Sequence, residues 1–208
     1  MAKLYFRHGA MNSGKSTALL QAAFNYEERG QRVLLAKAQV DTKGDAHVVS
    51  RLGISRQVDL LVSPEDDVRS RFQQLAAGAE PEALMDTVTL PPVSCLLVDE
   101  AQFLSPAQVE DLLRIAVLDG VPVLAYGIRT DFRTRSFPGS ARLLELAHSL
   151  EELKTICRCG RKAMFNARKV DGRFVFAGDQ VAIDGEVNYE SLCAACYLRF
   201  SDGALGPA

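Results

Sequence analysis

A glycine-rich segment near the amino terminus combines the residue types that bind the phosphates of a nucleotide. It matches the pattern G-x-x-x-x-G-K-[ST] and reads Gly9, Ala10, Met11, Asn12, Ser13, Gly14, Lys15 and Ser16, followed by Thr17. The glycines let backbone N–H groups wrap a phosphate, and a helix that begins here adds partial positive charge. We expect Lys15 to reach the β- and γ-phosphates and the hydroxyl of Ser16 to bind Mg²⁺.

Two adjacent carboxylates follow an apolar run in the middle of the chain, where residues 95–98 lead into Asp99 and Glu100. In P-loop proteins an acidic residue after a neighbouring strand holds Mg²⁺, so Asp99 is the candidate magnesium ligand beside Ser16. Glu100 is the candidate general base, because a carboxylate within hydrogen-bond reach can accept the proton of an acceptor hydroxyl. An ATPase can use a glutamate at this place to orient water, so this pair does not separate a kinase from a hydrolase.

A second polar segment, residues 127–137, follows another apolar run and contains three arginines and two phenylalanines. Arginines at the carboxyl edge of a sheet can stabilise the charge of a phosphoryl group in transfer. The aromatic rings can stack on a base. A basic surface loop has the same composition, and the residue types alone do not decide between the two interpretations.

Four of the five cysteines form two close pairs in the last quarter of the chain. They are Cys157 with Cys159 and Cys193 with Cys196, with 33 residues between the pairs. Four thiolates suit tetrahedral Zn²⁺, and a site of four cysteines has no open coordination position, so the predicted role is structural. Four free thiols, or a redox dithiol at the C-x-x-C pair, are the alternatives.

The elements that must position these groups alternate between two patterns. Apolar runs predict strands at residues 4–8, 32–37, 59–62, 95–98 and 121–126. Helical spacing and capping residues predict helices at residues 16–29, 66–77, 105–119 and 139–148. Such alternation predicts the α/β class, with a P-loop NTPase-like parallel sheet covered by helices on both faces.

The pattern changes after about residue 152, where cysteines, glycines and short strand-like runs become frequent. We predict an α/β nucleotide-binding domain over residues 1–152 and a small zinc-ribbon domain over residues 153–200. Residues 173–176 and 180–183 read as strands of the second domain. A small, polar tail, residues 201–208, is predicted to be disordered.

The overall composition excludes several classes of protein. The net charge of −2 and the lack of a long basic run argue against a nucleic-acid-binding protein. No window approaches the 18 or so apolar residues that a membrane span needs, and no targeting segment is visible. We therefore expect a cytoplasmic protein with neither nucleic acid nor membrane as partner.

Taken together, the motifs resemble the zinc-containing, tetrameric type of thymidine kinase. The similarity rests on four segments in the family's order, which cover nearly the whole chain: residues 9–17, 98–103, 126–132 and 153–163. A fifth segment, residues 180–185, precedes Tyr189 and the second cysteine pair. That order is far more specific than any single motif.

The resemblance implies ATP-dependent transfer of the γ-phosphoryl group to the 5′-hydroxyl of thymidine or deoxyuridine, with Glu100 as base. It implies a lasso between the cysteine pairs that closes over the nucleoside, and a role in nucleotide salvage for DNA synthesis. It also implies a homotetramer and feedback inhibition by thymidine triphosphate. The implied nucleoside-binding residues are Met11, Phe103, Ile128, Phe132, Phe137, Ile183 and Tyr189.

Three features depart from the family pattern. Asp184 precedes Gly185 where the family has two glycines, Lys43 replaces an arginine, and residues 76–92 resemble an insertion. Two other functions fit the phosphate motif itself: a zinc-ribbon ATPase acting on nucleic acid, and a nucleotide-binding regulator without turnover. A GTPase is not expected, because the chain has no N-K-x-D segment.

Overall fold

The computed structural model describes residues 1–39, 46–78, 90–180 and 187–206. Its centre is a six-stranded sheet in the order β5-β2-β6-β7-β1-β8, and all paired strands in it run parallel. The strands are β1 (Leu4–His8), β2 (Arg32–Ala38), β5 (Leu60–Val62), β6 (Val93–Asp99), β7 (Val123–Gly127) and β8 (Ser149–Glu152). The predicted α/β class is confirmed.

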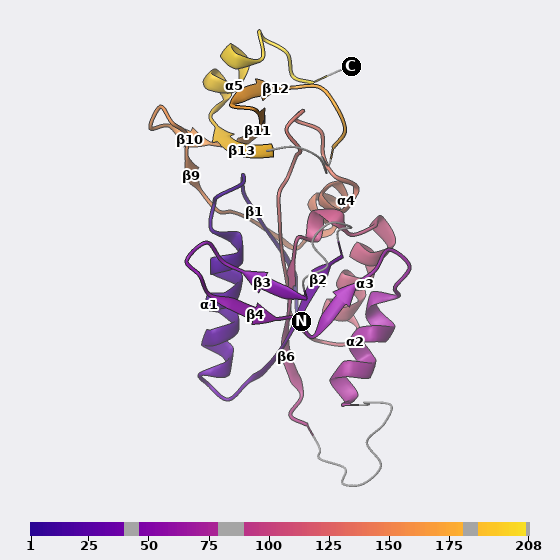
Figure 1. Ribbon diagram of the computed structural model, residues 1–208. Coiled ribbons are helices and arrows are strands. Elements are labelled where there is room, and N and C mark those ends of the chain that lie inside the picture. Colours follow the sequence, from indigo (N-terminus) through magenta and orange to yellow (C-terminus); the bar gives the residue numbers. More distant parts are fainter. Residues whose placement is uncertain (40–45, 79–89, 181–186, 207–208) are drawn as a thin grey trace.

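Helices cover both faces of this sheet, as Figure 1 shows. Helix α1 (Lys15–Glu27) packs on one face, and α2 (Val68–Ala77), α3 (Pro106–Val117) and α4 (Pro138–Leu146) pack on the other. Successive residues of a strand point to opposite faces, so a strand between two helical layers is apolar throughout. In β6, Leu97 packs toward α1, whereas Leu96 and Val98 pack toward α3. This explains the unbroken apolar runs of the sequence.

Local signals fix where the elements begin and end. Ser105 caps α3 by accepting a hydrogen bond from the backbone N–H of Gln108 at 3.2 Å, and the Gln108 side chain accepts one from the Ser105 N–H at 3.0 Å. This reciprocal pair is a capping box. The helix predicted at residues 139–148 ends at Leu146, because the chain then enters β8, a strand that the sequence analysis did not identify. A short hairpin, β3 (His47–Val49) with β4 (Ser55–Gln57), was also not predicted.

The cysteine module, defined here as residues 153–200, lies beyond the end of the sheet from which the phosphate motif extends (Figure 1). It contains the hairpin of β9 (Thr155–Ile156) and β10 (Lys162–Ala163), and a sheet of β12 (Arg173–Val175), β11 (Phe165–Val170) and β13 (Val187–Leu192). Helix α5 (Ala194–Phe200) follows the last strand. The strand predicted at residues 173–176 is confirmed, and the division at residue 152 stays a prediction.

Some predictions concern residues outside the described ranges: Lys43, Ile183, Asp184, Gly185, most of residues 76–92 and the last two residues. The part of the tail that is described makes specific contacts. The Thr134 hydroxyl donates a hydrogen bond to the carbonyl of Leu205 at 2.7 Å, and the Ser201 hydroxyl donates one to the carbonyl of Ala204 at 2.7 Å. No helix among the described residues is both long and apolar enough to cross a membrane.

Candidate active site and metal centre

The phosphate loop, defined as residues 9–16, connects β1 to α1 and has the backbone geometry that its glycines allow. A Cβ on Gly9 would lie 2.3 Å from the Ser13 Oγ and 2.5 Å from the Leu153 carbonyl oxygen, so only glycine fits there. Gly14 has a φ of 77°, which glycine adopts without strain. The buried Ser13 Oγ has no hydrogen-bond partner among the described residues. A buried hydroxyl without a partner is unfavourable, and a phosphate oxygen in the loop would supply one.

The candidate phosphate-binding lysine and the candidate magnesium ligands lie close together at the start of α1. The Lys15 ammonium donates hydrogen bonds to the carbonyls of Ala10 at 3.0 Å and Gly9 at 3.5 Å. Burial lowers the pKa of Lys15, while the charges of Glu100 and Asp99 act in the opposite direction. The Ser16 hydroxyl donates to the Asp99 carboxylate at 3.3 Å. Hydroxyl and carboxylate oxygens of this kind are the protein ligands that a P-loop offers to Mg²⁺.

Asp99 is a buried carboxyl group whose pKa is raised. Burial, followed by the charge of Glu100, raises the pKa of Asp99 to about 6, although its hydrogen bonds and Lys15 act to lower it. Two neighbouring carboxylates in a buried site disfavour each other's charge. A divalent cation would relieve this repulsion, so the electrostatics of the Asp99–Glu100 pair fit a magnesium site.

The candidate base Glu100 is held by Gln102, a residue to which the sequence motifs assigned no role. The Gln102 amide donates a hydrogen bond to the Glu100 carboxylate at 2.5 Å and accepts one from the Ile128 N–H at 3.2 Å. Gln102 is 1% exposed. Glu100 itself has a φ of 51°, an uncommon conformation for this residue that tends to occur at functional sites. A buried amide that links two loops can be recognised only from the fold.

A cleft of about 320 Å³ lies next to Gln102. Phe103 and Phe137 line it, with ring centroids 5.4 Å apart and planes at 77°, and Gln180 of the cysteine module also contributes. Apolar walls with a few polar groups are typical of small-molecule sites. Two of the residues predicted to bind a nucleoside are thereby brought together beside the partner of Glu100.

Ile128 lies beside Gln102, to whose side-chain oxygen its N–H donates, whereas Phe132 and Tyr189 lie at a second point, where the segment after β7 meets the cysteine module. Ile128 and Phe132 are buried at 4% and 1% exposure, and Tyr189 on β13 is half-buried. Arg168 lies between Phe132 and Tyr189, with its guanidinium carbon 3.7 Å from the Phe132 ring centroid and 5.7 Å from that of Tyr189. Of the arginines in the 127–137 segment, Arg133 pairs with Asp131 at 3.1 Å.

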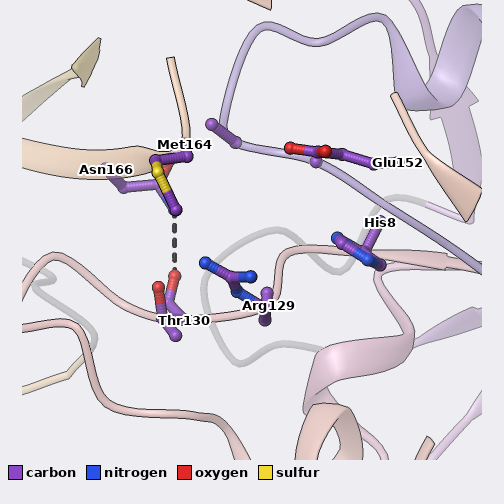
Figure 2. Close-up of a pocket in the computed structure, with 8 residues that line it drawn as sticks. His8, Arg129, Thr130, Glu152, Met164 and Asn166 are labelled. Atoms are coloured by element: carbon purple, nitrogen blue, oxygen red, sulfur yellow. Dashed lines mark hydrogen bonds between the residues drawn. The ribbon is translucent and has the colours of Figure 1, made fainter. Parts of the chain in front are cut away.

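Three side chains of the cysteine module form hydrogen bonds with the phosphate loop. The Met11 N–H donates a hydrogen bond to the Asn166 amide oxygen at 2.7 Å, and the Ser191 hydroxyl donates to the Met11 carbonyl. The Thr155 hydroxyl donates to the carbonyl of Asn12 at 3.3 Å. Asn166 is 2% exposed and also donates to the Thr130 carbonyl at 2.9 Å, the dashed line in Figure 2. The contacts to Met11 and Asn12 join segments over 140 residues apart, so no sequence pattern indicated them.

A small cavity behind the phosphate loop is lined by polar side chains. Figure 2 shows Arg129 in its centre, with Asn166 and Thr130 on one side and His8 and Glu152 on the other. Burial, and then the charge of Arg129, lower the pKa of His8. The cavity has a volume of about 10 Å³, which is room for about one water molecule. This cavity is therefore far too small for a nucleoside, and the cleft beside Gln102 is the larger site.

All four predicted metal ligands come together. The sulfur atoms of Cys157, Cys159, Cys193 and Cys196 lie within 4.8 Å of one another. A tetrahedral zinc site with Zn–S bonds of ~2.3 Å needs sulfur atoms about 3.8 Å apart, so the cluster fits such an ion. Cys193 also accepts a hydrogen bond from the Cys196 N–H at 3.5 Å. The four cysteines can hold a metal ion.

The pKa values of two thiols in this cluster are shifted in opposite directions. Burial acts to raise the pKa of Cys157, but the backbone N–H groups of Cys159 and Cys193 outweigh it and bring this pKa to about 7. Burial and the neighbouring sulfur atoms raise the pKa of Cys196 to about 12. Four thiolates so close together repel one another, and a bound divalent cation would stabilise all four.

Comparisons with known proteins identify the family of the chain. The family model described as thymidine kinase matches residues 2–197. The chain is 47% identical over 196 residues to a thymidine kinase of Ruegeria pomeroyi, covering 93% of this chain and 92% of the relative. It is 43% identical over 199 residues to a thymidine kinase of Chromobacterium violaceum, covering 95% and 98% of the two chains. It is 46% identical to one of Idiomarina loihiensis, with 93% and 94% covered. The chain therefore belongs to the thymidine kinase family.

Proposed function

We propose that the protein transfers the γ-phosphoryl group of ATP to the 5′-hydroxyl of thymidine or deoxyuridine, giving the monophosphate. The observation that carries this proposal is the convergence of a phosphate loop, a carboxylate pair and an apolar cleft at one end of a parallel sheet. Ligands bind at this end of open α/β sheets. Membership of the thymidine kinase family supports thymidine as the acceptor.

Each part of the site has a role in this transfer. The phosphate loop binds the triphosphate, and Lys15 stabilises the charge that develops on the transferring group. Glu100, held by Gln102, accepts the proton of the 5′-hydroxyl while its oxygen forms the new bond to phosphorus and ADP leaves. Phe103 and Phe137 line the acceptor side of the site, beside Gln102. Phe132 and Tyr189, which lie on either side of Arg168, form a second group of residues that would bind the nucleoside.

Two metal ions complete the proposal. Ser16 and Asp99 would hold Mg²⁺, which neutralises phosphate charge when bound with ATP. The four cysteines would hold Zn²⁺, which has no open coordination position there and stabilises the module. Because zinc ligation requires reduced thiols, a cytoplasmic location suits the protein.

Regulation and assembly are further parts of the proposal. Thymidine triphosphate joins a nucleoside to three phosphates, and the adjacent acceptor cleft and phosphate loop offer complementary groups to both parts. We therefore infer feedback inhibition by this end product, whose formation for DNA synthesis depends on the monophosphate. A homotetramer is inferred from the resemblance in sequence, and light scattering of the purified protein at working concentration measures it directly.

The alternative functions have less support. A zinc-ribbon ATPase would hydrolyse ATP without a nucleoside, but none of the relatives described above is named as one. A regulator without turnover would not need a carboxylate fixed beside the phosphate loop, as Glu100 is by Gln102.

The test is to supply ATP and Mg²⁺ with a panel of nucleosides, and to follow the nucleoside monophosphates by chromatography. We expect thymidine and deoxyuridine to be phosphorylated, and cytidine and the purine nucleosides to be left unchanged. Release of phosphate at the same rate with and without nucleoside would overturn the proposal in favour of the ATPase. Binding of ATP with no product from any nucleoside would favour the regulator.

A further inference from the structure

One buried cation in the cysteine module has no role in the site described so far. Arg168 lies on β11, opposite Tyr189 in the register of β13, and is 4% exposed. Its guanidinium carbon lies 3.7 Å from the centroid of the Phe132 ring, well inside the range of a cation–π contact. Phe132 belongs to the segment after β7, so this contact joins the cysteine module to the main sheet.

The hydrogen bonds of Arg168 reach two further segments. Its Nε donates to the hydroxyl of Tyr189 at 3.2 Å. Its Nη2 donates to the carbonyl of Asp179 at 2.7 Å and to that of Gln180 at 3.1 Å. The planar guanidinium thus fixes a phenol, a phenyl ring and two backbone carbonyls relative to one another. A lysine ammonium cannot reproduce this fork, because it is a compact charge on a flexible stem.

Stability alone does not account for this arrangement. All the contacts of Arg168 named here are to neutral groups, whereas a buried cation is favourable only when its charge is well compensated. Two carboxylates adjacent in sequence to the aromatic partners of Arg168 pair with other cations: Asp131 with Arg133 at 3.1 Å, and Glu190 with Lys169 at 2.6 Å. The guanidinium is therefore held by carbonyls and aromatic faces, an arrangement that suits positioning better than charge pairing.

We propose that Arg168 is the positioning residue of the acceptor site, holding Phe132, Tyr189 and the backbone at residues 179–180 in the arrangement that receives the nucleoside. The inference rests on the proposed function, since it assigns these groups to the acceptor. Gln180 connects the two parts of that site, because its carbonyl is bound by Arg168 and the residue also lines the cleft with Phe103 and Phe137. The Arg168 guanidinium acts through its neighbours and needs no contact with the reacting atoms.

The experiment compares Arg168→Lys, which keeps the charge, with Arg168→Met, which keeps only the packing. We expect both to raise the KM for thymidine by about 10- to 100-fold, the size expected for lost hydrogen bonds of a charged group. The KM for ATP should stay within about threefold, because none of the hydrogen bonds of Arg168 named above involves the phosphate loop. Tyr189→Phe should cause a smaller rise, and adding it to Arg168→Met should cause little more, because one hydrogen bond is shared.

A matched control is Lys169→Met, on the same strand. Lys169 contacts Glu190 and the Phe174 ring, with its ammonium 4.8 Å from that ring centroid, so its loss tests removal of a charge from β11 alone. It should leave the KM for thymidine within about twofold. An Arg168→Lys protein with an unchanged KM for thymidine would overturn the inference, as would an equal rise in both KM values. Wild-type protein that neither phosphorylates nor binds thymidine would instead overturn the proposed function together with this inference.

Discussion

The phosphate loop and the cysteine cluster are two candidate ligand sites that are built in opposite ways. The loop is a run of consecutive residues between β1 and α1, and its geometry comes from two glycines and the start of a helix that packs on the sheet. The cysteine cluster unites two pairs that are separated by 33 intervening residues, around a core of few buried residues. A small core seldom stabilises a fold without a metal or disulfides. The first region is thus formed by the fold, whereas we expect the second to depend on a bound metal ion.

The two regions meet at Met11 and Asn12, whose backbone is held by side chains of the cysteine module. Binding of the metal should therefore influence the phosphate site indirectly, through these hydrogen bonds. Coupling between two binding sites is reciprocal, so ATP should affect the affinity for the metal by the same factor, and Leu153 of the module also packs against the layer that contains α1.

The largest effect is expected from loss of the metal. Cys193→Ser, or prolonged chelation under reducing conditions, should unfold the cysteine module while leaving the central sheet intact, because metal binding provides much of the module's folding free energy. Hydrogen exchange would show loss of protection in β11 and β13 and retention in β6. Cys95→Ala is the control for loss of a thiol outside the cluster, since Cys95 lies within the main sheet. If β11 stayed protected from hydrogen exchange in metal-free protein, the module would not depend on a metal, and the contrast between the cysteine cluster and the phosphate loop would fail.

An intermediate effect is expected where the two regions meet. Asn166→Ala leaves the Met11 N–H without its partner in a buried position, so the phosphate loop should bind ATP–Mg²⁺ about tenfold more weakly, from the cost of one unsatisfied group. Calorimetry without nucleoside measures this affinity apart from acceptor binding. Thr155→Ala removes an exposed, longer hydrogen bond to Asn12, so it should have much less effect. Equal affinities in Asn166→Ala and wild type would mean that the module does not support the loop.

The smallest effect concerns stability within the phosphate site. The pKa of Asp99 is raised to about 6 from its ordinary 3.8, so between these pH values the folded protein retains a proton that the unfolded chain has released. Stability therefore falls as pH rises through this window, and the loss persists above it. Without ATP or Mg²⁺, Asp99→Asn should raise the melting temperature by a few degrees at pH 7.5 and not near pH 4.

The matched control for this change is Glu65→Gln, which replaces an exposed carboxylate by an amide and should leave the melting temperature unchanged at both pH values. A melting temperature of Asp99→Asn equal to or below that of wild type at pH 7.5 would contradict the raised pKa. The control separates a local effect of burial from a general effect of net charge.

Much of the phosphate site could be predicted from the sequence because its chemistry is local. The motif at residues 9–16, the apolar run before Asp99 and the capping residues of α3 each leave a pattern within a short window. The cysteines were also evident, since their spacing is typical of a metal site. In each case the residues that act together are neighbours in the chain or share a recognisable spacing.

The remaining features depend on contacts between distant segments. Gln102, Asn166 and Arg168 are polar residues whose roles follow from burial and from partners on other elements. No periodicity marks them, because each occupies a single position in a strand or a short 3-10 helix. Strand β8 was missed for a related reason: its alternating half-buried and exposed residues at the edge of the sheet lack the continuous apolar run of the central strands.

The central claim, that Glu100 takes the proton of a nucleoside hydroxyl beside a preformed phosphate loop, is tested most directly by Glu100→Gln. We expect phosphorylation of thymidine at saturating substrates to fall by about 10²- to 10⁴-fold, the usual contribution of a general base. ATP–Mg²⁺ affinity, measured by calorimetry on the same preparation, should stay within about twofold, because the substitution removes a base and no phosphate contact. A variant that phosphorylates thymidine at the wild-type rate would contradict the account.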